Sequence, residues 1–150
     1  MTNEYIVSPS TIAILPINES ISRVVEEDDV YMVKKSTRDI IDDSCKYYGS
    51  SFNGRKEGTK ALLGYNYKVP IVIDMQGSVI IFPISSARYN NTSWISLKKI
   101  KRFEKNNEYS KVYFKNDTIL TLPISYNSLE TQVLRASYLN QVIEERKNHY

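Results

Sequence analysis

The stretch GSSFNGRKEGT, residues 49–59, holds the residue types of a phosphate-binding segment. Three of the five glycines of the chain lie within it, next to the adjacent cations Arg55 and Lys56. Glycine lets the backbone approach a ligand closely, and hydroxyl and amide side chains donate hydrogen bonds to phosphate or sugar oxygens. Three interpretations follow: a nucleotide-hydrolysing phosphate loop, a basic loop that contacts nucleic acid, or an ordinary surface turn.

The phosphate-loop interpretation does not fit this stretch, because a magnesium ligand is missing and the predicted helix is on the wrong side of the glycines. In the pattern G-x-x-x-x-G-K-S/T, the Lys binds the β- and γ-phosphates and the hydroxyl ligates Mg²⁺. Arg55 and Lys56 occupy those two positions, so the hydroxyl is absent. A phosphate loop also leads into a helix N-terminus, whereas the helix predicted here precedes the glycines. The residues that follow include Gly58, Gly64 and Pro70, which disfavour a long helix.

No other catalytic or metal site is indicated. Cys45 is the only cysteine and His149, the penultimate residue, is the only histidine, so neither a zinc site nor a Cys–His dyad is expected. The carboxylate runs at 26–29 and 42–43 are typical of solvated surface. We therefore expect a protein that is not an enzyme and binds no cofactor or metal.

The basic-loop interpretation assigns a role to each polar side chain of the stretch. A slim loop tipped with Arg55 and Lys56 fits the narrow, electronegative minor groove of A/T-rich DNA. The other candidates carry groups suited to the phosphate and sugar backbone: Ser50, Ser51, Asn53 and Lys60.

The distribution of charge supports a polyanionic partner. Residues 44–115 carry 13 Lys and Arg against 4 Asp and Glu, whereas residues 1–43 carry 4 against 9. If residues 100–105 are extended, Lys99, Lys101, Phe103 and Lys105 share a face that can follow a phosphate backbone. The same charges also suit a strand edge that discourages aggregation. The peripheral phosphate contacts predicted here are Lys98, Lys99, Lys101 and Arg102.

The elements that position these residues form one α+β domain over residues 1–150. A length of 150 residues with 41% hydrophobic and 25% charged side chains is typical of a single globular domain. We predict a largely antiparallel sheet with one internal helix after Ser36, ended by Gly49, and a long C-terminal helix capped by Asn127. The strands are predicted at 11–15, 21–25, 30–34, 69–73, 78–82, 94–97, 100–105, 111–115 and 118–122. No apolar run is long enough to cross a membrane, and a single cysteine suits a reducing cytoplasm.

Two blocks of the sequence resemble a known family. SCKYYGSSFNGRKEGT (44–59) and LPISYNSLETQVLRASYL (122–139) are similar to the most recognisable blocks of the competence transcription factor family, ComK, and TIAILP and WIS occur in the same order. The resemblance implies a bacterial transcriptional activator of DNA-uptake genes that acts on the nucleoid. It also implies binding to paired A/T-rich boxes, mainly through the minor groove, as a homodimer or higher oligomer.

The resemblance implies further partners as well. An adaptor delivers family members to a Clp-type protease, and an activator is expected to act on RNA polymerase. Other members continue beyond the last predicted helix, so we expect a C-terminal tail of the family to be absent here. The rival interpretation is a protein-interaction module whose basic surface has no DNA selectivity. We also expect the apolar residues Leu134, Tyr138 and Val142 of the last helix to pair protomers.

Overall fold

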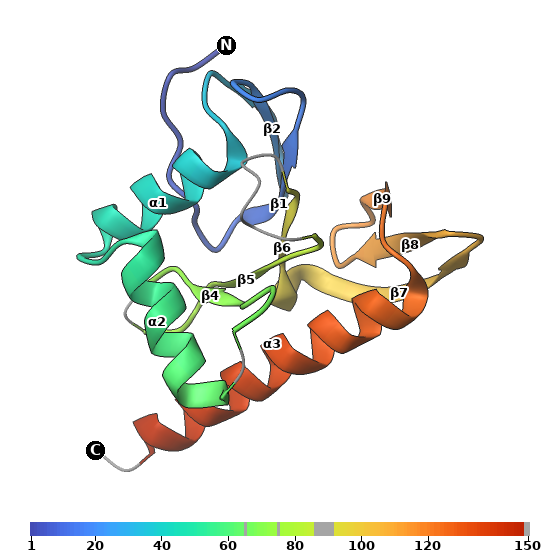
Figure 1. The fold of residues 1–150 in the computed structure, drawn as a ribbon. Coiled ribbons are helices and arrows are strands. Elements are labelled where there is room, and N and C mark those ends of the chain that lie inside the picture. Colours follow the sequence, from blue (N-terminus) through green and yellow to red (C-terminus); the bar gives the residue numbers. More distant parts are fainter. Residues whose placement is uncertain (65, 75, 86–91, 149–150) are drawn as a thin grey trace.

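The computed structural model describes residues 1–64, 66–74, 76–85 and 92–148. It is an α+β domain with three helices and mostly antiparallel sheet, as predicted (Figure 1). The helices are α1 (Thr37–Tyr47), α2 (Phe52–Leu63) and α3 (Tyr126–Lys147). The strands are β1 (Thr11–Pro16), β2 (Ser22–Glu26), β3 (Val30–Val33), β4 (Ile71–Val72), β5 (Ile80–Pro83), β6 (Trp94–Ser96), β7 (Ile100–Asn106), β8 (Tyr109–Phe114) and β9 (Ile119–Leu122).

The strands form two sheets in which all the neighbouring pairs described are antiparallel. The large sheet has the order β3-β2-β1-β6-β5-β4, and the small sheet has the order β7-β8-β9. At the β3 edge, Thr2 pairs with the strand, because its N–H donates to Met32 O and its carbonyl accepts from Lys34 N, both at 2.9 Å. At the opposite edge, β4 is only two residues long.

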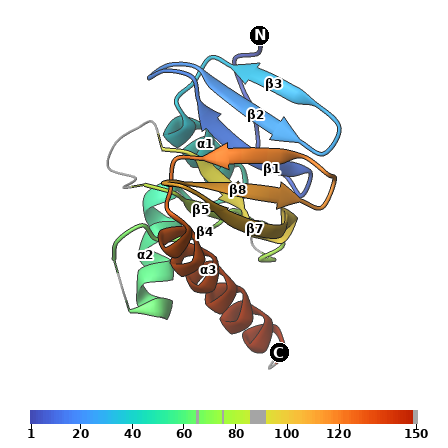
Figure 2. The ribbon, with the colours of Figure 1, turned by 90° about the vertical axis from the view of Figure 1, so that its right-hand side faces the viewer.

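The large sheet buries apolar side chains on both faces because its strands alternate. In β5, Ile80 and Phe82 point into one core and Ile81 into the other. The small sheet and α3 cover the first core, and α1 covers the second (Figure 2). Fully burying one such side chain contributes about 1.5–3 kcal/mol. The two-sided sheet therefore holds the three helices in fixed positions.

The predicted helix after Ser36 is confirmed. The Ser36 hydroxyl accepts a hydrogen bond from Asp39 N at 3.1 Å, which caps α1. The helix ends at Tyr48 as its C-cap, and Gly49 follows with φ 86°, a left-handed conformation that favours glycine.

The glycine-rich stretch is a helix, so the loop predicted there is wrong. Ser51 caps α2 because its hydroxyl accepts from Gly54 N at 2.9 Å, and the helix continues to Gly64, where φ is 77°. Each helical glycine costs about 1 kcal/mol relative to alanine. Packing offsets that cost, because the side chains of Phe52 and Thr59 are buried against the rest of the fold.

The long C-terminal helix is confirmed, but its start is two residues earlier than predicted. Ser125 is the cap in place of Asn127, because its hydroxyl accepts from Ser128 N at 3.2 Å. One face of α3 packs on the core, where Leu129, Ala136 and Leu139 are buried. In the ranges that the structure describes, no helix has the length and apolarity needed to span a bilayer.

Candidate nucleic-acid interface

Helix α2 divides the predicted DNA-binding residues between two faces. Residues three or four apart share a face of a helix, so Asn53, Lys56 and Lys60 lie together. We call these three residues the α2 surface. Asn53 is exposed, and the two lysines are partly exposed. Lys60 forms an ion pair with Glu57 at 3.3 Å.

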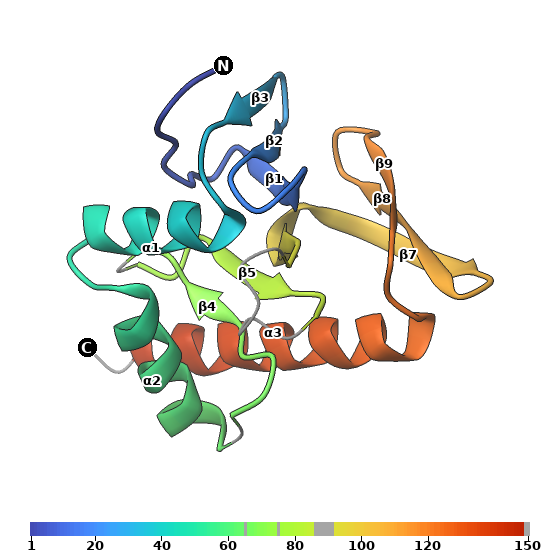
Figure 3. The ribbon, with the colours of Figure 1, turned by 45° about the horizontal axis from the view of Figure 1, so that its top comes forward.

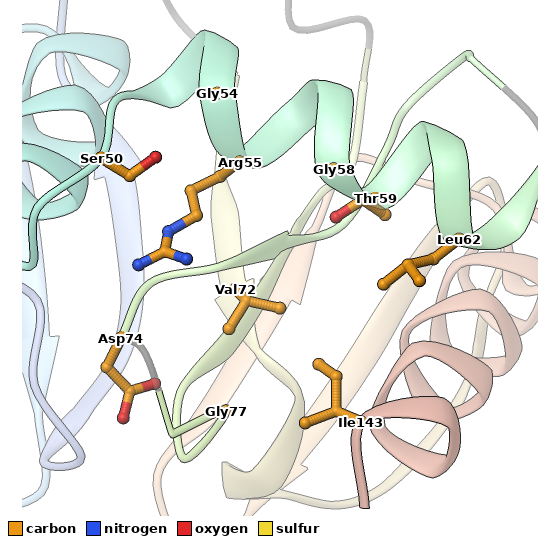
Figure 4. Close-up of a pocket in the computed structure, with 10 residues that line it drawn as sticks. All are labelled: Ser50, Gly54, Arg55, Gly58, Thr59, Leu62, Val72, Asp74, Gly77 and Ile143. Carbon is orange, nitrogen blue, oxygen red and sulfur yellow. The ribbon is translucent and has the colours of Figure 1, made fainter. Parts of the chain in front are cut away.

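The opposite face of α2 carries Arg55, which points toward the sheet. Figure 4 shows the guanidinium below the helix, on the side of Val72 and Asp74. It lines a pocket of about 380 Å³ together with Ser50. The expectation that Arg55 projects outward from a flexible loop is therefore wrong, because its position in the helix turns it inward.

The first turn of α2 is held by an acidic side chain from α1. Asp42 accepts a hydrogen bond from Phe52 N at 2.8 Å and forms an ion pair with Lys46 at 3.0 Å. The Phe52 N–H, followed by Lys46, lowers the pKa of Asp42 from its ordinary value, despite partial burial. One of the N–H groups that an anion would use at this helix N-terminus is therefore already occupied.

Two cations flank the ring of Phe52 at the same end of the helix. The Arg38 guanidinium lies 4.8 Å from the ring centroid and Lys56 Nζ lies 6.0 Å from it. The ring itself packs edge-on against Trp94, with centroids 5.8 Å apart. Phe52 thus fixes the helix to the core and brings positive charge to its N-terminus.

The second predicted cluster is partly used inside the fold. Lys98 Nζ donates to Gly77 O at 3.0 Å, and Lys99 forms a short ion pair with Glu27. Lys101 and Arg102 are exposed. Of the four predicted phosphate contacts, two are therefore tied to protein groups and two face solvent.

The predicted alignment of Lys99, Lys101, Phe103 and Lys105 on one face is correct only for Phe103 and Lys105, which alternate regularly in β7. A bulge between Ile100 and Arg102 shifts the alternation of β7. Phe103 consequently turns inward and packs against Tyr126, with ring centroids 5.3 Å apart.

The outer face of the small sheet carries a basic and aromatic group instead. Arg102 lies 3.6 Å from the ring centroid of Tyr113, and Lys111 lies 5.3 Å from it. Glu104 accepts from Tyr113 Oη at 2.8 Å and pairs with Arg102 at 3.1 Å. The hydrogen bond from Tyr113, followed by Arg102, lowers the pKa of Glu104.

The position of Tyr113 beside Arg102 was not predicted, because it depends on strand register. The two residues are cross-strand partners in β7 and β8. Lys101, at the bulge, and Lys105, which pairs with Ser110 and so points to the face of Phe103, are exposed and form no ion pair with any residue that the structure describes. We call four cations of this hairpin the hairpin surface: the exposed Lys101, Arg102 and Lys105 and the half-buried Lys111.

The elements that carry the two surfaces lie near opposite ends of α3: α2 near its C-terminus, and β7 with β8 near its start (Figure 3). Ile143, near its C-terminus, lines the pocket beneath α2, and Tyr126, at its start, contacts Phe103 of β7. From Tyr126 to Ile143 the helix rises about 26 Å, at about 1.5 Å per residue. The residues predicted from sequence therefore form two separate surfaces.

The described ranges contain no cluster of three metal-ligating side chains. Cys45 is buried, and burial raises the pKa of its thiol to about 12. A thiol with so high a pKa is a poor nucleophile at neutral pH. His149 lies outside the described residues.

Comparison with known proteins identifies the family. A family model described as "ComK protein" matches residues 2–148. The Competence transcription factor of Bacillus subtilis (strain 168) is 37% identical over 149 residues, which cover 97% of this chain and 78% of that protein. No solved structure matches the chain. The chain belongs to the ComK protein family.

Proposed function

We propose that this protein is a competence transcription factor that binds A/T-rich DNA mainly through the minor groove. The observation that carries the proposal is the similarity, over nearly the whole chain, to a protein named Competence transcription factor. The concentration of Lys and Arg in residues 44–115 supports a polyanionic partner.

The hairpin surface is the better candidate for the groove. Antiparallel strands enter DNA grooves in several known classes of DNA-binding protein. Lys101 and Lys105 are exposed cations without ion pairs among the described residues, so binding DNA breaks no existing salt bridge of theirs. The Arg102 guanidinium lies 3.6 Å from the ring centroid of Tyr113 and pairs with Glu104, and these two contacts hold it at the surface.

The α2 surface is the candidate for the phosphate backbone. Lys56 and Asn53 lie in the first turns of a helix, where the helix dipole favours anions. Ser51 is occupied as the helix cap, and Ser50 lines the pocket below the helix. Lys56, Lys60 and Asn53 are therefore proposed as positioning contacts that carry no sequence information.

The exposed face of α3 is proposed to pair protomers on DNA. Leu134 and Tyr138 are separated by one helical turn, and their exposed fractions are 64% and 53%. Neighbouring apolar side chains this exposed are a common feature of protein interfaces. Contacts with a protease adaptor and with RNA polymerase remain predictions.

Fluorescence anisotropy with labelled A/T-rich and G/C-rich duplexes tests the proposal. Lys101→Gln/Lys105→Gln is expected to weaken binding to the A/T-rich duplex and to reduce the salt slope by about two units. Each bound cation, in the groove or at the backbone, neutralises phosphate charge and contributes about 0.9 to the slope. Lys34→Gln/Lys147→Gln removes the same charge elsewhere and is the matched control. A small minor-groove ligand added in excess is expected to displace the protein.

Three results would contradict the proposal in different ways. Equal affinity for both duplexes refutes A/T selectivity. Binding that survives a saturating minor-groove ligand refutes the groove assignment. The absence of binding to either duplex favours the protein-interaction module over a DNA-binding protein.

A further inference from the structure

The pocket beneath α2 combines a cation with an apolar wall. It lies between α2, β4 with the turn that follows it, and the C-terminal half of α3 (Figure 4). Leu62, Val72 and Ile143 supply aliphatic side chains from these three elements, and Arg55 supplies the positive charge. Its volume of about 380 Å³ is at the lower end of the range for small-molecule sites.

Arg55 has hydrogen-bond donors without acceptors. Its Nε is buried and has no hydrogen-bond partner among the residues that the structure describes. Guanidinium groups donate only, so a missing acceptor cannot be replaced by a change of protonation. A ligand with acceptor oxygens is the natural complement of this group.

The carboxylate of Asp74 lines the same pocket but already accepts hydrogen bonds from residues of its own turn. It accepts from Val79 N at 3.1 Å and from Ser78 N at 3.3 Å, and the Ser78 hydroxyl makes a further short contact. Asp74 is 8% exposed. The charge of Arg55 is therefore left without a salt bridge partner in the described part of the chain.

Gly58 leaves the side of the pocket formed by α2 without a side chain. Gly58 lines the pocket, and a Cβ built there would meet no atom within 4 Å. The space next to the helix backbone is therefore free for a ligand.

We infer that this pocket binds a short, branched aliphatic carboxylate. The carboxylate would pair with Arg55, whose planar fork matches two acceptor oxygens. The branched chain would contact Leu62, Val72 and Ile143. A phosphate fits less well, because its second negative charge would lie near Asp74 and its lack of an apolar part would leave the aliphatic wall uncovered.

Titration followed by two-dimensional NMR of the full chain tests this inference, with isovalerate as the probe. Isovaleramide, a neutral molecule of the same shape, is the control ligand. We expect saturable shifts at the backbone amides of Gly54, Gly58 and Gly77, with affinity in the millimolar range. Isovaleramide is expected to bind at least about tenfold more weakly.

Two variants locate the charge responsible. Arg55→Met keeps the aliphatic stem, removes the guanidinium and is expected to abolish the shifts. Lys56→Met removes the neighbouring cation on the outer face and is expected to leave them unchanged.

Several outcomes would overturn the inference: equal binding of acid and amide, binding retained by Arg55→Met, shifts elsewhere than the pocket, or no saturable binding. Inorganic phosphate binding as tightly as isovalerate would show a general anion site only. The comparison of isovalerate with isovaleramide needs only the wild-type protein. It therefore tests whether the pocket requires a carboxylate even if Arg55→Met does not fold. None of these measurements involves DNA, so the inference stands or falls separately from the proposed function.

Discussion

Replacing Gly58 with alanine distinguishes a helix from a flexible loop at residues 52–63. Gly58 lies in the interior of α2, and a Cβ there would contact nothing within 4 Å. Alanine is therefore free of steric cost at this position. Because glycine loses more backbone entropy on entering a helix, the substitution is expected to stabilise the protein.

The expected gain is about 0.8–1 kcal/mol, the difference in helix propensity between the two residues. For a domain of this size, that corresponds to an increase in Tm of about 2–4 °C. Urea unfolding followed by circular dichroism measures it as a higher midpoint with an unchanged slope.

Gly64 is the matched control, because it ends the same helix with φ 77° and a Cβ there would also contact nothing within 4 Å. Gly64→Ala forces alanine into the left-handed region and is expected to destabilise the protein by about 1 kcal/mol. A loss of stability in Gly58→Ala, or the same sign of change in both variants, would refute the helical assignment of α2.

Two further predictions concern the half-buried Asp42 and the buried Cys45 of α1. The lowered pKa of Asp42 means that the unfolded chain takes up the proton more readily, so stability is lost as pH falls through the folded-state pKa. Asp42→Asn is expected to lower the free energy of unfolding by about 1 kcal/mol at pH 7. Urea unfolding at several pH values should also show a smaller loss of stability in acid than in the wild type. An unchanged loss of stability in acid would contradict this. The Cys45 thiol, with its pKa raised to about 12, is expected to react with iodoacetamide at pH 8 only as fast as the protein unfolds, and rapid labelling of the folded protein would contradict its burial.

Local signals in the sequence located most of the elements. The antiparallel strands and the helix after Ser36 were predicted correctly, because both depend on neighbouring residues. The long C-terminal helix was also predicted from local residues. Its cap was misplaced because Asn127 and Ser125 both suit an N-cap, and only the contact of Ser125 with Ser128 decides between them.

Helix α2 was not predicted, because its own residues disfavour a helix and contacts with distant residues stabilise it. Gly54 and Gly58 argue against a helix, but Asp42 from α1 fixes its first turn and Phe52 anchors it beside Trp94. Such contacts between distant residues leave no periodic pattern in one sequence. The same limit explains why Arg55 was expected to point outward.

The placement of the second basic cluster also depended on long-range contacts. The ion pair of Lys99 with Glu27 and the bulge in β7 cannot be read from the spacing of the lysines. The sequence therefore indicated which cations were candidates, but only the structure separates the exposed Lys101 from the engaged Lys98.

The sheet edges restrict how copies of this protein can assemble. Thr2 already occupies the backbone groups of the outer strand β3, and β4 offers a template of only two residues. The small sheet has two outer strands, β7 and β9, and at β7 Lys101 and Lys105 would bring like charges together. Growth of an intermolecular sheet at β3, β4 or β7 is thereby disfavoured. Copies of the protein that meet at these edges would rely on side-chain contacts, which can be reversed without unfolding any strand.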